Sequence, residues 1–334
     1  MRQAYRWTVL PALCVLSLCL LSACGGGGGS SATATAEHNF SGGGTNVVPV
    51  TVGPGPADPA YQTFNIPYVS VTVCEPATAN CAVIDDVMVD TGSSGLRLMA
   101  SVLAAHNLSL PAIADPNGAN TNTIHECLPF ADGYAWGAVS SATVKVGGET
   151  TANAIPVEVI DDSSSPSPVA PSSCSQSGTA LNSVDAFDAN GVLGVSTLNQ
   201  DCGSGCEPGG TTSDVYYTCT AAGACQSTTQ AAADQVANPV ASFPIDNNGV
   251  ILQLPQISAA GAATASGYLV FGIGTQSNNS LGSAKVLTAD ANGFFITTFQ
   301  QKTLGNSFID SGSNGLYFPN TTSPIALCGA AGTS

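Results

Sequence analysis

The sequence VMVDTGSSGLRL at residues 87–98 recurs in altered form as FIDSGSNGLYF at residues 308–318. Apolar residues lead into Asp90 and Asp310, and each aspartate is followed by a hydroxyl residue, Gly, Ser, a small polar residue, Gly and Leu. A single Asp-Thr/Ser-Gly is common in polar turns, but two copies that share their flanking residues are more specific. The repeat predicts two half-sites of one catalytic centre. The alternative is a pair of ordinary polar turns that follow strands.

The composition favours a protein of strands and turns. Charged residues make up only 8% of the 334 residues, against 44% hydrophobic residues and 37 glycines, which is unlike a protein of exposed helices. The length permits one large domain or two lobes. The formal net charge of −16 repels phosphate backbones, so we expect no nucleic-acid partner.

Residues 1–24 have the features of a secretory signal. Arg2 and Arg6 precede an apolar run at residues 9–21, which is too short for a stable membrane span. The sequence Leu-Ser-Ala-Cys that ends at Cys24 resembles the bacterial lipobox, which implies a lipid anchor on Cys24; an ordinary signal peptide with an incidental cysteine is the alternative. The glycine after it resembles the pattern sorted to the outer membrane, so we expect an exported lipoprotein that faces the periplasm or the cell exterior.

Changes in composition divide the rest of the chain. We predict a Gly/Ser/Thr-rich tether at residues 25–60, an N-terminal β lobe at 61–200, a polar Cys-containing connection at 201–245 and a C-terminal β lobe at 246–334.

Strand patterns lead directly to the first motif. Alternating valines at residues 67–73 and an apolar run at 82–89 predict a β-hairpin whose second strand ends at Asp90. The sequence Gly-Val-Leu-Gly at residues 191–194 predicts a place where two backbones approach closely. Further strands are expected at 142–146, 154–160, 249–254, 267–272 and 294–299, and short helices at 101–108 and 228–240.

Nine of the 12 cysteines follow Cys24. In an exported protein they favour disulfides over metal ligands. Spacing suggests three local bridges and one longer one, although sequence alone does not fix connectivity: Cys74/Cys81, Cys202/Cys206, Cys219/Cys225 and Cys127/Cys174. A zinc site made by the four cysteines between residues 202 and 225 is the alternative. Cys328 is then left without a partner.

The paired motifs resemble those of pepsin-like aspartic peptidases, and still more those of an uncharacterised family of bacterial lipoproteins with paired Asp-Thr/Ser-Gly motifs. The Gly-Val-Leu-Gly sequence at 191–194 and Gly-Tyr-Leu-Val-Phe-Gly at 267–272 are also similar to elements of the pepsin-like family, in the same order. The resemblance implies an all-β, bilobal fold with a cleft between the lobes. It also implies hydrolysis of peptide bonds without a cofactor or a metal.

The resemblance assigns the chemistry to Asp90 and Asp310, two carboxylates that share a proton and activate a water molecule. We assign the role of base to neither of them, because their titration belongs to the pair. The residues expected to support this site, for which ordinary turn composition is the alternative, are Thr91, Gly92, Ser93, Ser311, Gly312 and Ser313.

Two features depart from the family pattern: the residue at position 97, and the flap region, where no aromatic residue is a clear match. Arg97 stands where the family commonly has a tryptophan that supports a tyrosine of the flap, the hairpin that covers the cleft. We expect Arg97 to be either an ion-pair partner near the cleft or a solvated surface residue. The candidates for the flap aromatic residue are Phe130 and Tyr134.

The chain continues for only 24 residues after Asp310, so we expect the second lobe to be incomplete. The predicted function is that of an acid endopeptidase with a peptide or protein substrate. The alternative is a catalytically inactive pepsin-like envelope lipoprotein with a binding or structural role.

Overall fold

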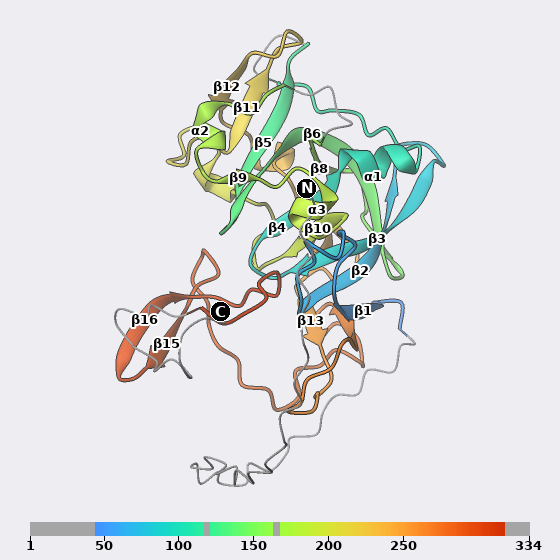
Figure 1. The fold of residues 1–334 in the computed structure, drawn as a ribbon, viewed down its shortest axis with the longest axis vertical. Coiled ribbons are helices and arrows are strands. Elements are labelled where there is room, and N and C mark those ends of the chain that lie inside the picture. The colour runs from blue at the N-terminus through green and yellow to red at the C-terminus, as the bar shows by residue number, and fades with distance from the viewer. Residues whose placement is uncertain (1–43, 117–120, 163–167, 318–334) are drawn as a thin grey trace, which may run out of the picture. The chain divides into compact units, whose positions relative to one another are not determined.

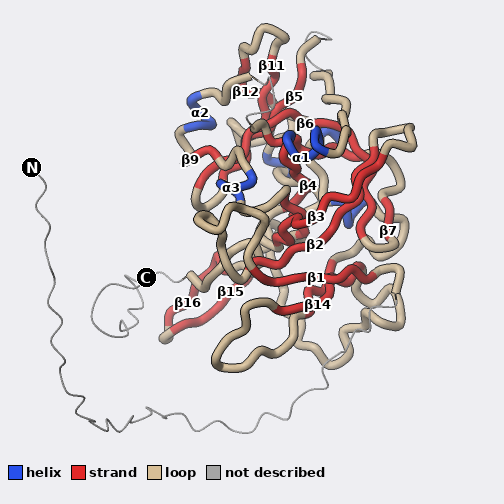
Figure 2. The backbone as a smooth tube through the Cα atoms, turned by 45° about the vertical axis from the view of Figure 1, so that its right-hand side comes forward, coloured by secondary structure: helices blue, strands red, loops and turns tan. Residues whose placement is uncertain are grey.

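The structure is a computed structural model that describes residues 44–116, 121–162 and 168–317 (Figure 1). All of them belong to one compact unit, residues 39–334. Strands dominate and the helices are short (Figure 2), so the predicted all-β class is confirmed. No described helix is long and apolar enough to cross a membrane. The predicted signal segment, with Cys24, lies outside the described residues, as does Cys328.

The described chain contains sixteen strands and six short helical segments. The strands are β1 (Val47–Gly53), β2 (Ile66–Cys74), β3 (Cys81–Asp90), β4 (Ser94–Met99), β5 (Thr123–Pro129), β6 (Gly133–Val146), β7 (Glu149–Thr150), β8 (Ile155–Ile160), β9 (Thr179–Ala180), β10 (Gly191–Val195), β11 (Tyr216–Cys219), β12 (Cys225–Thr228), β13 (Val250–Gln253), β14 (Ala265–Phe271), β15 (Phe295–Phe299) and β16 (Lys302–Ser307). The helices are α1 (Ala100–Ala105), α2 (Ser172–Ser175) and α3 (Val184–Phe187), with 3₁₀ turns η1 (Gly203–Gly205), η2 (Ala232–Asp234) and η3 (Pro239–Ser242).

One 14-stranded sheet contains every strand except β15 and β16, which pair only with each other. Its order is β12-β11-β5-β6-β8-β4-β10-β3-β2-β1-β14-β13, and β7 and β9 pair with β6. A further pairing of β6 with β2 closes the strands β6, β8, β4, β10, β3 and β2 into a ring. Closure turns alternate side chains inward, and the main hydrophobic core is built largely from them.

The hairpin of β2 and β3 confirms the prediction from alternating valines. Val69, Val71 and Val73 are buried, whereas Ser70 between them is exposed. A β-bulge in this hairpin shifts the register of β3 after Ile84, so that Val87 and Val89 also face the core. β3 therefore reaches its last residue, Asp90, as a strand anchored on both sides.

The tether predicted at residues 25–60 is wrong in its described part, because it contains β1. This strand pairs with β2 through Thr51 and Tyr68, and with β14 through Val47 and Val270. Val48 and Val50 of β1 are buried in the core. A short apolar sequence between Gly-rich and Pro-rich segments thus forms a central strand, because both of its edges find partners.

Of the other strand and helix predictions, all but one are confirmed. The strands expected at 142–146, 154–160, 249–254, 267–272 and 294–299 overlap β6, β8, β13, β14 and β15, and the helix expected at 101–108 overlaps the shorter α1. The helix expected at 228–240 is wrong. Only η2 and the start of η3 form there, because Gln235 is extended and the Asn238 side chain accepts a hydrogen bond from the Val240 N–H to start a new turn. The polar connection also contributes β11, which extends the sheet at β5.

Four disulfides join the cysteines in the suggested pairs: Cys74–Cys81, Cys127–Cys174, Cys202–Cys206 and Cys219–Cys225. The alternative of a zinc site is wrong, since its four cysteines are oxidised in two bridges. No cluster of metal-ligating side chains occurs within the described ranges.

Candidate active site

Asp90 is the last residue of β3, and the chain turns after it into β4. β10 pairs with both strands, with Gly194 opposite Asp90 on one side and opposite Gly95 on the other. A Cβ atom at Gly194 would lie 2.8 Å from the backbone carbon of Ser94, so this position accepts only glycine. The close approach predicted for residues 191–194 is confirmed, and it fixes both ends of the turn.

The loop after β16 carries Asp310 and is joined to the first loop by reciprocal hydrogen bonds. The backbone N–H of Thr91 donates to Oγ of Ser311 at 3.1 Å, and the N–H of Ser311 donates to Oγ1 of Thr91 at 3.0 Å. The Thr91 hydroxyl also donates to the carbonyl of Ile309 at 2.8 Å, and that of Ser311 to the carbonyl of Val89 at 2.6 Å. Each hydroxyl is therefore an acceptor and a donor across the junction.

The Asp90 carboxylate accepts hydrogen bonds from its own loop. The N–H of Gly92 donates to Oδ1 at 2.7 Å, and the hydroxyl of Ser93 donates to Oδ2. Gly92 also lies against the opposite loop, because a Cβ atom there would be 2.9 Å from Cγ of Asp310. The missing side chain is thus what allows the second carboxylate to approach.

The same arrangement surrounds Asp310. The N–H groups of Gly312 and Ser313 donate to its Oδ1 at 2.9 and 3.1 Å, and the Ser313 hydroxyl donates to Oδ2 at 2.5 Å. A Cβ atom at Gly312 would lie 3.0 Å from Cγ of Asp90. The eight residues predicted from the two motifs therefore meet in one place, and each half repeats the geometry of the other.

The pKa of Asp90 is raised above its ordinary value. Burial of the carboxyl is the largest cause; the hydrogen bonds from Ser93 and Gly92 lower the pKa, and the charge of Asp310 raises it further. Two neighbouring carboxylates cannot both ionise at low cost, so the pair retains a proton to a higher pH than a lone aspartate would. Such a pair can act as base and acid at the same time.

A pocket of about 890 Å³ opens beside Asp310. It is lined by the β15–β16 hairpin and the loop after it, and Asp310 and Ser313 are among its lining residues. Phe295, Leu304 and Leu316 contribute to its lining. A largely apolar hollow with a carboxylate in its lining is suited to a ligand with an apolar side chain and a polar backbone.

The two flap candidates flank the turn of the β5–β6 hairpin. The ring of Phe130 packs edge-to-face against Phe187, with 5.4 Å between ring centroids. Tyr134 is buried in a cluster with Trp136 and the Cys127–Cys174 disulfide. In the described residues, neither ring has a hydrogen bond or ring contact with Asp90 or Asp310.

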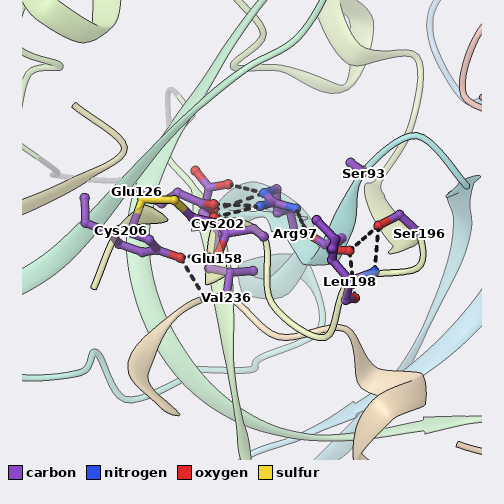
Figure 3. A network of polar contacts seen from close by, with 12 residues as sticks. Ser93, Arg97, Glu126, Glu158, Ser196, Leu198, Cys202, Cys206 and Val236 are labelled. Carbon is purple, nitrogen blue, oxygen red and sulfur yellow. Dashed lines mark hydrogen bonds and ion pairs between the residues drawn. A yellow bond between two sulfur atoms is a disulfide. The ribbon is translucent and has the colours of Figure 1, made fainter. Parts of the chain in front are cut away.

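Arg97 is fully buried, so the interpretation as a solvated surface residue is wrong and the ion-pair interpretation is confirmed. Its guanidinium faces Glu126 and Glu158 (Figure 3). Asp201 is a third acidic neighbour, at 3.6 Å. Sequence reasoning did not identify these three carboxylates as partners. Glu126 and Glu158 lie in strands, and a lone acidic residue inside a strand gives no sign of which cation it meets.

Comparison with known proteins gives a family without an assigned activity. Residues 42–334 match the model of the family described as "Protein of unknown function (DUF3443)". The matched range includes both Asp motifs. No curated protein matches the chain.

Proposed function

The chain belongs to this family of unknown function, and we propose that it is a pepsin-like acid endopeptidase that hydrolyses bonds in peptide or protein substrates. One observation carries the proposal. The reciprocal hydrogen bonds of Thr91 and Ser311 bring the Asp90 and Asp310 loops together. Two carboxylates held in this way are the chemical requirement for general acid–base hydrolysis without a cofactor.

The chemistry follows from one proton shared by two carboxyl groups. The ionised aspartate removes a proton from a water molecule, which attacks the scissile carbonyl carbon. The protonated aspartate donates a hydrogen bond to the carbonyl oxygen and stabilises the tetrahedral intermediate. The intermediate then collapses, the C–N bond breaks, and the amine leaves with a proton returned by the pair.

The surroundings of the pair support a peptide substrate. The apolar pocket beside Asp310 offers a place for a substrate side chain, and Ser313 also lines it. The bilobal, pepsin-like arrangement belongs to this proposal as well. In a bilobal arrangement of this kind, strands β13 to β16 form part of the second lobe.

The test is digestion of an unfolded protein by the purified chain between about pH 3 and pH 6, where a shared-proton pair works. Asp90→Asn and Asp310→Asn should each lower kcat by about 10²–10⁴-fold. Asp85→Asn is the matched control, because Asp85 lies in the same strand but is exposed, and its carboxylate accepts a hydrogen bond from the Ser70 hydroxyl. Cleavage that survives either active-site change would refute the proposal.

A second candidate, a catalytically inactive envelope lipoprotein with a binding or structural role, is favoured by one observation. Phe130 and Tyr134 pack inside their own part of the fold, so no described aromatic residue of the hairpin covers the two carboxylates. In this case the native chain cleaves nothing at acid pH, yet still binds unfolded protein. Binding that is lost on filling the pocket, for example with Leu304→Trp, would identify it.

We also propose that Cys24 carries a lipid that anchors the protein to the outer membrane, facing the periplasm or the cell exterior. The small residues before Cys24 and the Gly-rich sequence after it support this proposal. Cys24→Ser should abolish incorporation of a labelled fatty acid and move the protein from the membrane fraction to the soluble fraction. Unchanged labelling in this variant would exclude Cys24 as the site.

A further inference from the structure

A buried arginine lies directly behind the Asp90 loop. Arg97 belongs to β4, and its side chain is fully buried. Its Nη1 donates to the carbonyl of Ser94 at 2.8 Å, while Nη2 and Nε bind the two carboxylate oxygens of Glu126 at 2.6 and 3.0 Å. A single planar group thus joins the start of β4 to the middle of β5, in the hairpin that carries the flap candidates.

Ser94 is the first residue after the turn that begins at Asp90, and it is held from several sides. Its hydroxyl lies 2.5 Å from Oγ of Ser196 and donates to the carbonyl of Leu198 at 2.9 Å. The N–H of Ser196 donates to the carbonyl of Ser93 at 2.9 Å (Figure 3). Among the described residues of this network, Arg97 is the charged donor to the Asp90 loop.

Three acidic side chains surround the single positive charge of Arg97. Glu126, Glu158 and Asp201 approach the one guanidinium at 2.6, 3.1 and 3.6 Å, and all three carboxyl groups are buried. Among the described residues, both carboxylate oxygens of Glu158 and Oδ2 of Asp201 have no hydrogen-bond donor. A proton on each of these two groups converts it from an unsatisfied acceptor into a donor. Arg97 and Glu126 then remain as the single ion pair.

The directions in which the pKa values shift agree with a proton on Glu158 and one on Asp201. Burial raises the pKa of Glu158 and Asp201 well above the ordinary values, and the charge of Glu126 adds to the effect. Burial also acts to raise the pKa of Glu126, but Arg97 and the hydrogen bonds around it outweigh burial and lower it. These directions favour Glu126 as the charged counter-ion of Arg97 and a proton on each of the other two carboxyl groups.

We propose that Arg97, held in place by Glu126, is a positioning residue that acts through the Ser94 carbonyl to fix Asp90 opposite Asp310. An apolar pair of similar volume often stabilises a buried site as well as an ion pair does, but it cannot donate a hydrogen bond to the Ser94 carbonyl. Only a donor of fixed geometry can bind Ser94 and Glu126 together, and guanidinium provides it. The role rests on the proposed function of Asp90.

The experiment compares the double variant Arg97→Met/Glu126→Leu with Glu158→Gln. Glu158→Gln is the control, because a glutamine replaces a protonated glutamic acid with little change in shape or charge. The double variant guards against misfolding, because it removes both charges together. Each variant is measured for thermal unfolding, for hydrogen exchange of the amides at residues 92–95, and for kcat and KM at acid pH.

We expect the double variant to unfold cooperatively, to exchange the amides at 92–95 about tenfold faster, and to lose about 10- to 100-fold in kcat with little change in KM. Glu158→Gln should match the native chain in all three measurements. Native exchange and native kcat in a folded double variant would overturn the proposal, as would equal effects of Glu158→Gln. If the native chain cleaves no peptide, the proposed function fails, and hydrogen exchange still decides whether Arg97 fixes the loop.

Discussion

The hydroxyl of Thr91 and the hydroxyl of Ser311 each accept a hydrogen bond from the other residue's backbone N–H, at 3.0 and 3.1 Å. Each residue is next to an aspartate, so the junction transmits the position of one carboxylate to the other. The strength of the junction comes from four hydrogen bonds made by two side chains.

Thr91→Val should open this junction without changing the size of the side chain. The variant leaves the Ser311 N–H and the Ile309 carbonyl without their partner, which costs about 1–3 kcal/mol of unfolding free energy. Activity should fall by about 10- to 100-fold, because the carboxylates separate. Urea unfolding and peptide cleavage measure the two effects. Thr72→Val on β2 is the control, and equal behaviour of the two variants would contradict the prediction.

Gly92→Ala should separate the carboxylates more directly. The new Cβ atom would lie 2.9 Å from Cγ of Asp310, which is closer than carbon atoms approach without movement. We expect kcat/KM to fall about 100-fold while the chain stays folded.

Gly305→Ala provides the comparison for Gly92→Ala, since a Cβ atom at Gly305 would meet no atom within 4 Å. Its unfolding free energy should change by less than about 0.5 kcal/mol. Because Gly305 lines the pocket beside Asp310, this variant is a control for folding and not for activity. A Gly92→Ala variant with native kcat would show that the second carboxylate is not needed at this distance.

Local sequence signals account for the parts of this fold that depend on neighbours in the chain. The alternation of residues 67–73, the hairpin that ends at Asp90 and the bridge between Cys74 and Cys81 are all local, and the sequence predicts each of them. The two Asp motifs lie far apart in the chain, but the sequence reveals their relationship because both copies have the same pattern of residues.

Other features depend on contacts that leave no pattern in the sequence. Arg97 meets Glu126 and Asp201 only because β4, β5 and the loop after β10 converge, and each of these residues alone also fits a surface position. β1 was missed for the same reason: its strand character comes from partners at β2 and β14, distant in the chain. Long-range pairing therefore decides what composition alone assigns to a tether.

The Cys127–Cys174 disulfide should contribute more stability than the other three. It closes 47 residues, whereas Cys74–Cys81 closes only seven. Loss of chain entropy in the unfolded state predicts about 4 kcal/mol for the long bridge and about 2.5 kcal/mol for the short one. Paired Cys→Ala variants of each bridge, compared by urea unfolding under oxidising conditions, measure the difference. A larger cost for the short bridge would contradict the prediction.

The carboxyl groups of Glu158 and Asp201 should make the protein less stable as the pH rises. Their pKa values in the folded state are raised well above the ordinary values, by burial and then by the charge of Glu126. The folded state therefore holds these protons more tightly than the unfolded state. The stabilisation is complete below about pH 4, where the unfolded groups are also protonated, and it is lost as the pH rises through the folded values.

Glu158→Gln and Asp201→Asn should each flatten this pH dependence, because an amide does not titrate. Urea unfolding between about pH 4 and pH 8 measures it. The exposed Asp132 provides the control, since Asp132→Asn should leave the slope unchanged. A native slope in both cluster variants would contradict the assignment of protons to these groups.

His125 should make the protein more stable, not less, as the pH rises. Burial lowers its pKa to about 4, against a small rise from a backbone hydrogen bond with Thr123, and its ring stacks on Trp136 with 5.2 Å between centroids. Because the folded pKa is depressed, the neutral ring stabilises the fold fully above about pH 6.5, and this stability is lost as the pH falls toward the folded value. The loss is at most about 3 kcal/mol.

His125→Phe keeps an aromatic ring at this position without titrating, so the native chain should lose stability relative to this variant on acidification. The exposed His106→Gln variant should follow the native chain instead, and a parallel response of His125→Phe and the native chain would show that the buried ring does not titrate in this range.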